Sequence, residues 1–460
     1  MAGALAVIET FRDPAGSLRV EGERVRRRVR PEYAGAALDF LESDLAYAWV
    51  SKGRLIATTV PEGQDRNGEL LLEHPRIFFP SYPWEWTPGA WVAAAELTLD
   101  LCESLVGKGL ILKDATPLNV LFEGPRPVFV DVLSIEKRDP GSPLWMAFAQ
   151  FVRTFLLPLA AYRYLGWPLA ASLHRRDGYQ PGDLYPHLSF IQRWQQPLRT
   201  LVTMPYLLEK RQNGAATGMR LEQDPAVAEA VLRRNLHRLR ATVQALKGEE
   251  RGSRWSEYPE SADHYKTEDH QQKKTFVRRA LLEISPKHVL DLGANTGVYS
   301  RLAASLGASV VAWDTDLAAS ERNWQQACEE RREVQAVIAD AARPTPATGW
   351  RNAESLGLLD RTYGRFDCVM MLGLVHHLLI SDQIPLGEVA DLLSDLTTQW
   401  AIVEWVPASD PRFAELVRGR EEIYKHLNEA EFVTAMERYF VTAQKERLKN
   451  GRTLYLLELR

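Results

Sequence analysis

The chain has 460 residues, of which 45% are hydrophobic and 25% charged, and its formal net charge is −4. This composition is that of an ordinary globular protein with two or three domains, and the weak negative charge excludes a general electrostatic attraction to nucleic acid or anionic membranes. The three cysteines have neither metal-site nor disulfide spacing, so we expect buried thiols in a reducing cytoplasm and no metal site.

No targeting or membrane-spanning segment is predicted. The amino terminus lacks a basic region followed by a long apolar run, so we expect no signal peptide. The most apolar stretch, residues 145–173, is interrupted by Arg153, Pro158 and Arg163. It therefore lacks the ~18 uncharged residues of a spanning helix and predicts buried core helices.

The first 85 residues predict a hairpin, a helix and an aromatic segment. Residues 17–29 alternate as two strands, and the second strand is rich in arginine. These arginines favour an exposed edge strand over a site for a polyanion, because positive charge commonly protects sheet edges. A helix is expected over residues 33–53. The aromatic and proline-rich residues 76–91 form either a binding platform or, more commonly for such residues, a packing contact between lobes.

A second helix, residues 87–107, leads into a segment with regularly spaced polar residues. Asp114 precedes Asn119 by five positions, a hairpin follows, and Asp131 comes next. This order resembles the catalytic segment of protein kinases and aminoglycoside phosphotransferases. The resemblance implies that Asp114 would accept a hydroxyl proton, while Asn119 and Asp131 would hold Mg²⁺ against the phosphates of ATP. The helical stretch 144–248 would complete the large lobe.

The kinase-like segment also departs from the family pattern. Lys113 precedes Asp114, Val132 and Leu133 follow Asp131, and no glycine-rich loop followed by a strand lysine is recognisable. Two interpretations remain open. In the first, the domain is a scaffold that has lost phosphotransfer, keeps a vestigial nucleotide and Mg²⁺ site, and supports substrate binding or assembly. In the second, it is an active kinase.

Residues 249–274 are polar and poor in aliphatic side chains, which predicts a domain boundary. We expect a kinase-like domain over residues 1–248, with a small lobe to about residue 85, a linker or lid over 249–274, and a second domain over 275–460. Tyr265 and Lys274 would contact a ligand if the segment closes as a lid. Alternatively, its aromatic residues hold the two domains together.

The second domain begins with a strand, a glycine-containing turn and a helix. A short apolar strand starts at Val289 and is predicted to end at Asp291. Gly293 and Gly297 then allow the backbone to turn, and a helix starts at Val298. This is the first unit of a doubly wound sheet. An anionic group of a ligand would lie against the N–H groups of the helix, and Gly297 would let the backbone approach the ligand.

Four further strands and a hairpin follow. The second strand lies within residues 309–316 and ends at Asp314, and the third covers residues 334–340 and ends at Asp340. The fourth lies within residues 366–379, where it runs into a helix, and the fifth covers residues 400–406. An acid about twenty residues after a glycine turn suits the two hydroxyls of a ribose. Asn450-Gly451 between alternating strands predicts a closing antiparallel hairpin.

Together these features resemble the class I S-adenosylmethionine (SAM)-dependent methyltransferases. The resemblance implies an α/β fold with a doubly wound, Rossmann-like, seven-stranded sheet ending in an antiparallel hairpin, preceded here by the helix-rich α+β kinase-like domain. It also implies the cofactor contacts. The methionine part of SAM would be surrounded by Asp291, Gly293, Asn295 and Gly297, the ribose held by Asp314, and the adenine amino group by Asp340, with further contacts from Tyr265 and Leu372. Asn295 replaces a glycine of many relatives, which its tolerance of positive φ allows.

The chain as a whole resembles a group of bacterial methyltransferases, some of them described as related to a host-specific nodulation protein. The shared stretches are SYPWEW, LKDATPLNVLF, PVFVDVLS, VLDLGANTG, VHHLL and VEWVPASDP. They lie in both predicted domains, so the resemblance implies that the two domains belong together.

Three residues are candidates for catalysis. Methyl transfer requires mainly alignment and exclusion of water, but an amine or hydroxyl acceptor must also lose a proton, for which histidine is best suited. His376 and His377 follow the fourth strand, and we expect one of them to face the acceptor with a near-neutral pKa. Glu404 ends the fifth strand. Structural roles remain the alternatives: a histidine bonded to a backbone carbonyl, and an exposed loop carboxylate.

The sequence therefore predicts a methyltransferase that modifies an O or N atom of a small-molecule, sugar or lipid-linked acceptor. The alternatives are a bifunctional kinase and methyltransferase, or a SAM-binding regulatory or docking protein. RNA as a substrate would require a basic domain or a recognition module, and neither is recognisable.

Overall fold

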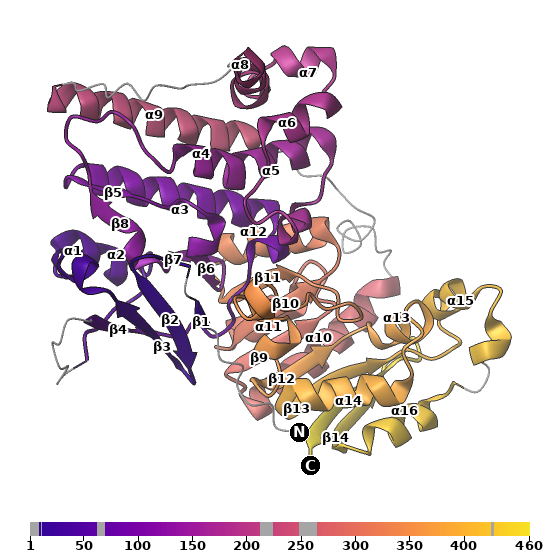
Figure 1. Cartoon of the computed structure of the whole chain (residues 1–460). Coiled ribbons are helices and arrows are strands. Elements are labelled where there is room, and N and C mark those ends of the chain that lie inside the picture. Colours follow the sequence, from indigo (N-terminus) through magenta and orange to yellow (C-terminus); the bar gives the residue numbers. More distant parts are fainter. Residues whose placement is uncertain (1–8, 11, 62–69, 212–223, 248–264, 425–426) are drawn as a thin grey trace. The chain divides into compact units, whose positions relative to one another are not determined.

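The computed structural model describes residues 9–10, 12–61, 70–211, 224–247, 265–424 and 427–460 (Figure 1). Internal contacts divide the chain into two compact units, Val7–Glu249 and Glu250–Arg460, called here the N-terminal and C-terminal units. Over the described ranges, no helix has both the length and the apolar character needed to cross a membrane.

The N-terminal unit begins with a four-stranded antiparallel sheet. Its strands are β1 (Glu9–Thr10), β2 (Gly16–Glu21), β3 (Arg24–Val29) and β4 (Leu70–Pro75), in that order across the sheet. The predicted hairpin is β2 and β3, but the predicted edge strand is wrong. Strand β3 pairs with β2 on one side and β4 on the other, and Arg27 is buried. The partner strand lies some forty residues further along the chain, where local patterning does not reveal it.

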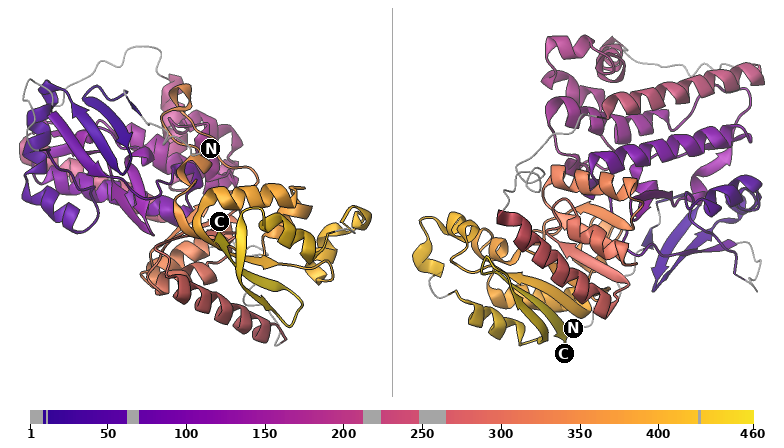
Figure 2. Two further views of the ribbon diagram at one scale, coloured as in Figure 1. Left: turned by 90° about the horizontal axis from the view of Figure 1, so that it is seen from below. Right: turned by 180° about the vertical axis from the view of Figure 1, so that it is seen from behind.

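Capping residues set the helix boundaries in this unit. The helix predicted over residues 33–53 is two helices, α1 (Pro31–Leu41) and α2 (Asp44–Ser51), because Ser43 accepts the N–H of Ala46 and starts a new helix. Helix α3 (Pro88–Val106) follows the prediction, and it lies beside α9 (Pro225–Leu246) in Figures 1 and 2.

The aromatic segment packs inside the N-terminal unit. The Trp86 ring lies edge-on to Trp91 and to Phe122, with ring centroids 5.9 and 5.1 Å apart. All three rings are buried, so these residues form core and no binding platform.

Short elements complete the N-terminal unit. Strand β5 (Leu110–Leu112) pairs with β8 (Ile135–Lys137), and β6 (Val120–Glu123) pairs with β7 (Arg126–Phe129). The helices that follow are α4 (Phe148–Phe151), α5 (Leu157–Ala160), α6 (Pro181–Leu184), α7 (Phe190–Trp194) and α8 (Met204–Arg211). Between them lie short 3₁₀ and π turns, among them Tyr185–His187 and Arg199–Thr203.

The C-terminal unit is built on a seven-stranded mixed sheet with the order β11-β10-β9-β12-β13-β15-β14. The strands are β9 (His288–Leu292), β10 (Ser309–Asp314), β11 (Val334–Ile338), β12 (Phe366–Met371), β13 (Thr397–Trp405), β14 (Phe440–Arg447) and β15 (Thr453–Leu459). The first five are parallel, and β15 is antiparallel to both β13 and β14. The predicted α/β class with a large mixed sheet is thus confirmed. Strand succession reverses between β9 and β12, which creates a topological switch point.

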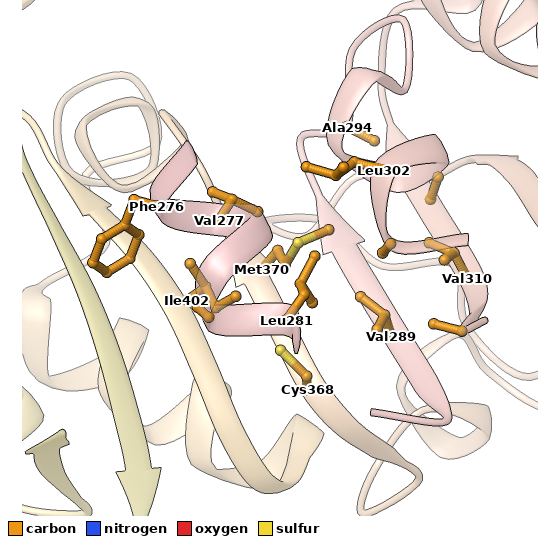
Figure 3. Packing of buried hydrophobic residues seen from close by; sticks show 14 of the residues in the cluster. Phe276, Val277, Leu281, Val289, Ala294, Leu302, Val310, Cys368, Met370 and Ile402 are labelled. Atoms are coloured by element: carbon orange, nitrogen blue, oxygen red, sulfur yellow. The ribbon is translucent and has the colours of Figure 1, made fainter. Parts of the chain in front are cut away.

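Helices cover both faces of this sheet. They are α10 (Tyr265–Ile284), α11 (Val298–Ser305), α12 (Leu317–Glu329), α13 (Val375–Ile380), α14 (Leu386–Leu396), α15 (Pro411–Val417) and α16 (Glu429–Met436). Helices α10 and α14 lie on opposite faces (Figures 1 and 2). Figure 3 shows Phe276, Val277 and Leu281 of α10 packed beside Met370 and Ile402 of the sheet.

Helix α10 begins inside the segment predicted as a linker. The last ten residues of that segment, 265–274, are helical, and residues 249–264 lie outside the described part. The helix carries many polar side chains because only one of its faces reaches the core, and its composition therefore resembles that of a linker.

Candidate cofactor and active site

A cavity of about 660 Å³ lies at the carboxyl ends of the parallel strands of the C-terminal unit. Its volume is within the range of small-molecule sites. Most of the predicted site residues of this unit line it: Asp291, Gly293, Asn295, Asp314, Asp340, Leu372, His376, His377 and Glu404. Gly297 lies next to the lining residues Thr296 and Val298, and the side chain of Tyr265 lies outside the described residues.

The turn after β9 has three residues with left-handed backbone conformations. The φ angles of Gly293, Asn295 and Gly297 are 70°, 51° and 75°. A β-carbon added to Gly297 would lie 1.8 Å from the Oδ1 atom of Asn323 on α12. Gly297 therefore permits close packing of the turn on α12, whereas the sequence suggested an approach of the backbone to the ligand.

Asp314, at the end of β10, fixes this turn. Its Oδ2 atom accepts the backbone N–H of Asn295 at 2.7 Å, and its Oδ1 atom accepts the N–H of Asp316 at 2.8 Å. Burial raises the pKa of Asp314, although these backbone hydrogen bonds act in the opposite direction. Each carboxylate oxygen has a second lone pair, so the side chain can still accept two hydroxyl groups from the cavity.

Asp291 is buried beneath the turn. Its Oδ2 atom accepts the hydroxyl of Ser300 at 2.6 Å. Burial raises the pKa of Asp291 to about 6, and neither this hydrogen bond nor the charge of Lys273 fully offsets that effect. A positively charged ligand group in the cavity would stabilise the ionised form of Asp291.

Asp340 has several partners at the end of β11. Its Oδ1 atom accepts the N–H groups of Ala342 and Arg343 at 2.8 and 3.2 Å, and its Oδ2 atom pairs with the Arg343 guanidinium at 3.1 Å. Arg343 also pairs with Asp382 at 2.7 Å. Asp340 therefore holds the loop after β11 as well as facing the cavity.

Glu404 is buried and paired with two cations. Its side chain is 1% exposed, with Lys273 Nζ 2.6 Å from Oε2 and an Arg452 guanidinium nitrogen 3.5 Å from Oε1. Burial opposes ionisation of Glu404, but Lys273 and Arg452 together hold its pKa below the ordinary value. The interpretation of Glu404 as an exposed loop carboxylate is therefore wrong.

The cations of this network were not identified from the sequence. Lys273 and Arg452 both line the cavity, and Arg452 also pairs with Asp410 at 2.7 Å. Lys274, the lysine suggested by the sequence, is exposed on α10. Lys273 and Lys274 are adjacent, so only their angular positions on helix α10 show which of them points into the cavity. The polar sequence of this segment does not predict a helix and therefore does not give these positions.

Removing Lys273 should strongly destabilise the C-terminal unit. Lys273→Met leaves the buried Glu404 with one long contact, and breaking a buried ion pair typically costs about 3–5 kcal/mol. The double variant Lys273→Met/Glu404→Gln should recover most of this loss. Lys274→Met is the matched control and should change the free energy of unfolding by less than about 0.5 kcal/mol. Denaturant unfolding measures all three, and equal effects of the two lysine variants would contradict the network.

The two histidines lie together on α13 and both line the cavity, so the expectation that only one faces it is wrong. Their ring centroids are 4.3 Å apart. His376 is buried, and its Nδ1 atom has no hydrogen-bond partner among the described residues. Burial, reinforced by His377 and Arg452, lowers the pKa of His376 to about 3. The expected near-neutral titration is therefore wrong for His376.

This low pKa predicts a pH dependence of stability. Native His376 takes up a proton only near pH 3, while in the unfolded chain it does so near its ordinary value of 6.5. Above pH 6.5 the neutral His376 ring does not lower the free energy of unfolding. As the pH falls below 6.5, the unfolded chain takes up a proton that the native protein does not, and the free energy of unfolding falls by about 1.4 kcal/mol per pH unit. In His376→Asn this loss should be absent. Denaturant unfolding of both proteins at several pH values between about 6 and 4 tests this, and parallel stability curves would contradict it.

In the N-terminal unit, hydrogen bonds through Ser134 connect two of the three kinase-like residues, and the third, Asp114, lies close enough to Asp131 for the two carboxylates to interact. Asp131 accepts hydrogen bonds from the Arg27 guanidinium and the Ser134 hydroxyl, and the Asn119 amide donates to Ser134 Oγ at 3.1 Å. Burial raises the pKa of Asp131, but Arg27 and Ser134 outweigh it, so the pKa lies below the ordinary value. Asp114 instead accepts a hydrogen bond from the Gln150 amide at 3.5 Å.

Arg27 is a site residue that the sequence did not reveal. It lies on β3, is buried, and its Nε atom has no hydrogen-bond partner among the described residues. The kinase pattern predicts a strand lysine, whereas an arginine in an arginine-rich strand is typical of edge protection. Within the described ranges, no three His, Cys, Asp or Glu side chains are grouped as metal ligands would be.

Arg27→Met should destabilise the N-terminal unit by up to about 3–5 kcal/mol, because it removes the guanidinium that pairs with Asp131, whose side chain is only 18% exposed, and leaves only the more distant charge of Lys113. Arg26 lies next to it and forms a partly exposed pair with Glu73, so Arg26→Met should cost no more than about 1 kcal/mol. Denaturant unfolding compares the two variants. Recovery of stability in Arg27→Met/Asp131→Asn would support the assignment, and equal losses in the two arginine variants would contradict it.

Comparison with known proteins gives one relative of similar length and several partial structural similarities. No protein-family model matches the chain. The chain is 29% identical over 470 residues to nodulation protein NoeA of Rhizobium meliloti (strain 1021), covering 98% of this chain and 96% of NoeA.

The structural similarities cover less than half of the chain. One is magnesium protoporphyrin IX methyltransferase (ChlM) from Synechocystis PCC 6803 with bound SAH, at 17% identity, 44% of this chain, 89% of ChlM and a TM-score of 0.33. Another is N-methyltransferase NodS from Bradyrhizobium japonicum WM9, at 11% identity, covering 42% of this chain and 97% of NodS, with a TM-score of 0.32. A third is the bifunctional kinase-methyltransferase WbdD, at 20% identity, covering 41% of this chain and 39% of WbdD, with a TM-score of 0.30.

Proposed function

We propose that the C-terminal unit is a SAM-dependent methyltransferase that modifies an O or N atom of a small-molecule, sugar or lipid-linked acceptor. One observation carries the proposal. The turn after β9 and the acids that follow β10 and β11, Asp314 and Asp340, line a single cavity at the switch point of the sheet. Ligands of open α/β sheets bind in this crevice.

The cavity offers groups that suit each part of SAM. The two oxygens of Asp314 can accept the vicinal ribose hydroxyls. Asp340 also lines the cavity, and we assign it to the adenine amino group. Asp291 lies beneath the turn, where the positive charge of the methionine end would favour its ionised form. When bound, SAM supplies a methyl group on an already activated sulfonium.

The protein's own residues then align the acceptor and remove its proton. We assign proton removal to His377, because burial and the low pKa of His376 make that neighbour a weak base near neutral pH. His376 supports the His377 ring from one side. Glu404 holds Lys273 and Arg452 at the cavity wall, and its lowered pKa suits this role better than that of a base.

Transfer of a labelled methyl group tests the proposal. The full chain is incubated with methyl-labelled SAM and fractionated extract from cells that make the protein, and the aqueous and lipid fractions are counted separately. We expect label in a small-molecule, sugar or lipid fraction. Label found only in protein or nucleic acid would contradict the proposed acceptor class.

For the N-terminal unit we propose a kinase-like scaffold that supports acceptor binding or assembly. The engagement of Asp131 by Arg27 favours this, since a guanidinium already compensates the carboxylate that would hold Mg²⁺. The clustering of Asn119, Ser134 and Asp131 keeps a bifunctional kinase as the second candidate. Magnesium-dependent ATP turnover that is lost in Asp131→Asn would establish this second function.

A further inference from the structure

Helix α7 exposes its apolar side chains. Phe190, Ile191 and Trp194 are 77%, 68% and 50% exposed, and no residue of the helix is buried. A surface helix normally turns its apolar residues toward the core. Large apolar residues are often exposed singly, but a group of them usually marks an interaction surface. We call Phe190, Ile191 and Trp194 the α7 face.

Two cations are fixed beside this face. The Arg193 guanidinium lies 4.2 Å from the Tyr185 ring centroid, and the Lys210 ammonium lies 4.8 Å from that of Tyr206. The two tyrosine rings stack with their centroids 4.1 Å apart. This row of cation, two rings and cation joins α7 to α8, and these helices lie next to each other in Figures 1 and 2.

Other features of the region agree with this arrangement. Thr203 Oγ1 donates to the Arg193 carbonyl oxygen at 2.6 Å, which ties α7 to the turn before α8. On α8, Met204 and Leu208 are also exposed. Exposed apolar side chains are therefore present on both α7 and α8.

The local charge is opposite in sign to that of the whole chain. Residues 185–210 contain three cations, Arg193, Arg199 and Lys210, against one acid, Glu209, which gives +3 − 1 = +2, whereas the chain carries −4. Arg199 and Lys210 are exposed. A partner for this surface should therefore be apolar where it meets the α7 face and anionic around it.

We propose that this surface docks on an anionic lipid membrane. Exposed tryptophan, phenylalanine and isoleucine bordered by arginine and lysine are typical of protein surfaces that enter the boundary between headgroups and acyl chains. The cations contact lipid phosphates. The binding is peripheral and is carried by the N-terminal unit, so it stands or falls independently of methyl transfer.

Flotation of the full chain with vesicles tests the proposal. We expect binding to phosphatidylcholine vesicles only when phosphatidylglycerol is included, with weaker binding at high salt. Phe190→Ser/Ile191→Ser/Trp194→Ser should lower the partition coefficient roughly tenfold or more, because the apolar contact is lost. Arg199→Gln and Lys210→Gln should each lower it about fivefold.

Tyr47→Ser is the matched control, since Tyr47 is 77% exposed on α2 of the same unit and should not affect binding. Thermal unfolding shows whether each variant is folded, and Trp194→Ser alone replaces the triple variant if that one is unfolded. Absence of wild-type binding to anionic vesicles, or equal binding by the folded α7 variant, would overturn the proposal. The proposal would also be overturned if the wild-type protein were a dimer in the absence of vesicles and the α7 variant a monomer, because the α7 face would then bind a second copy of the chain.

Discussion

Replacing His377 with asparagine is expected to lower the rate of methyl transfer roughly 10²–10⁴-fold, the usual contribution of a general base. His377 lines the cavity beside His376, whose pKa is about 3 and which therefore has little basicity near neutral pH. Asparagine keeps a polar side chain of similar reach. SAM affinity should stay nearly constant, because His377 is not among the predicted cofactor contacts and most of these lie at the ends of β9, β10 and β11.

The rate is measured with saturating SAM across pH, and SAM affinity is measured separately by calorimetry. His270→Asn is the control, since His270 also lines the cavity but lies on α10. A wild-type rate in His377→Asn would show that alignment alone drives the reaction. A collapse of SAM binding in this variant would show that the histidine holds the loop after β12.

Replacing Asp314 with alanine should weaken SAM binding about 10²–10⁴-fold. Two hydrogen bonds to the ribose would be lost, each worth roughly 1.5–3 kcal/mol because the acceptor is charged. The same change removes the acceptor of the Asn295 and Asp316 N–H groups, so the turn after β9 would also lose its support. Asp314→Asn separates these effects, because it keeps one acceptor oxygen without the charge.

The affinities are compared by calorimetric titration. Asp316 also lines the cavity, but it caps α12 by accepting the N–H of Ala319 at 2.8 Å. Asp316→Ala should therefore destabilise α12 by about 1 kcal/mol with a smaller effect on affinity. Wild-type affinity in Asp314→Ala would remove this residue from the cofactor site.

The parts of the site that could be predicted are those with a local pattern. Asp291, Asp314 and Asp340 lie at or just beyond the carboxyl-terminal end of apolar strands, and strand ends of a parallel sheet meet at one edge. The terminal hairpin was equally visible, because Asn450-Gly451 stands between two alternating strands.

The parts that could not be predicted depend on contacts between distant segments. Glu404 is paired with Lys273 and Arg452, which are separated from it by 131 and 48 positions. Arg27 reaches Asp131 over 104 positions. Ion pairs of this kind leave no periodic signal. An arginine-rich strand likewise gives no local sign of a second partner strand far along the chain, and that partner, β4, is what places β3 inside the sheet.

The pKa of His376 was mispredicted for a related reason. A histidine after a strand was expected to titrate near neutral pH, but the ring is enclosed, and the nearby charges of His377 and Arg452 add to the cost of protonation. The environment that lowers its pKa comes from α13 itself and from the hairpin residue Arg452, which only the folded chain brings together.

Titration of SAM into the full chain, alongside titration of NADH, tests the central claim most directly. A dinucleotide would also bind at a glycine turn followed by an acid. Comparing SAM with NADH therefore distinguishes the proposed SAM site from a dinucleotide-binding site. We predict that SAM binds at one site in the C-terminal unit, that Asp314→Ala weakens this binding, and that NADH does not compete for the site. Binding of NADH with no binding of SAM, or SAM binding that Asp314→Ala leaves unchanged, would contradict it.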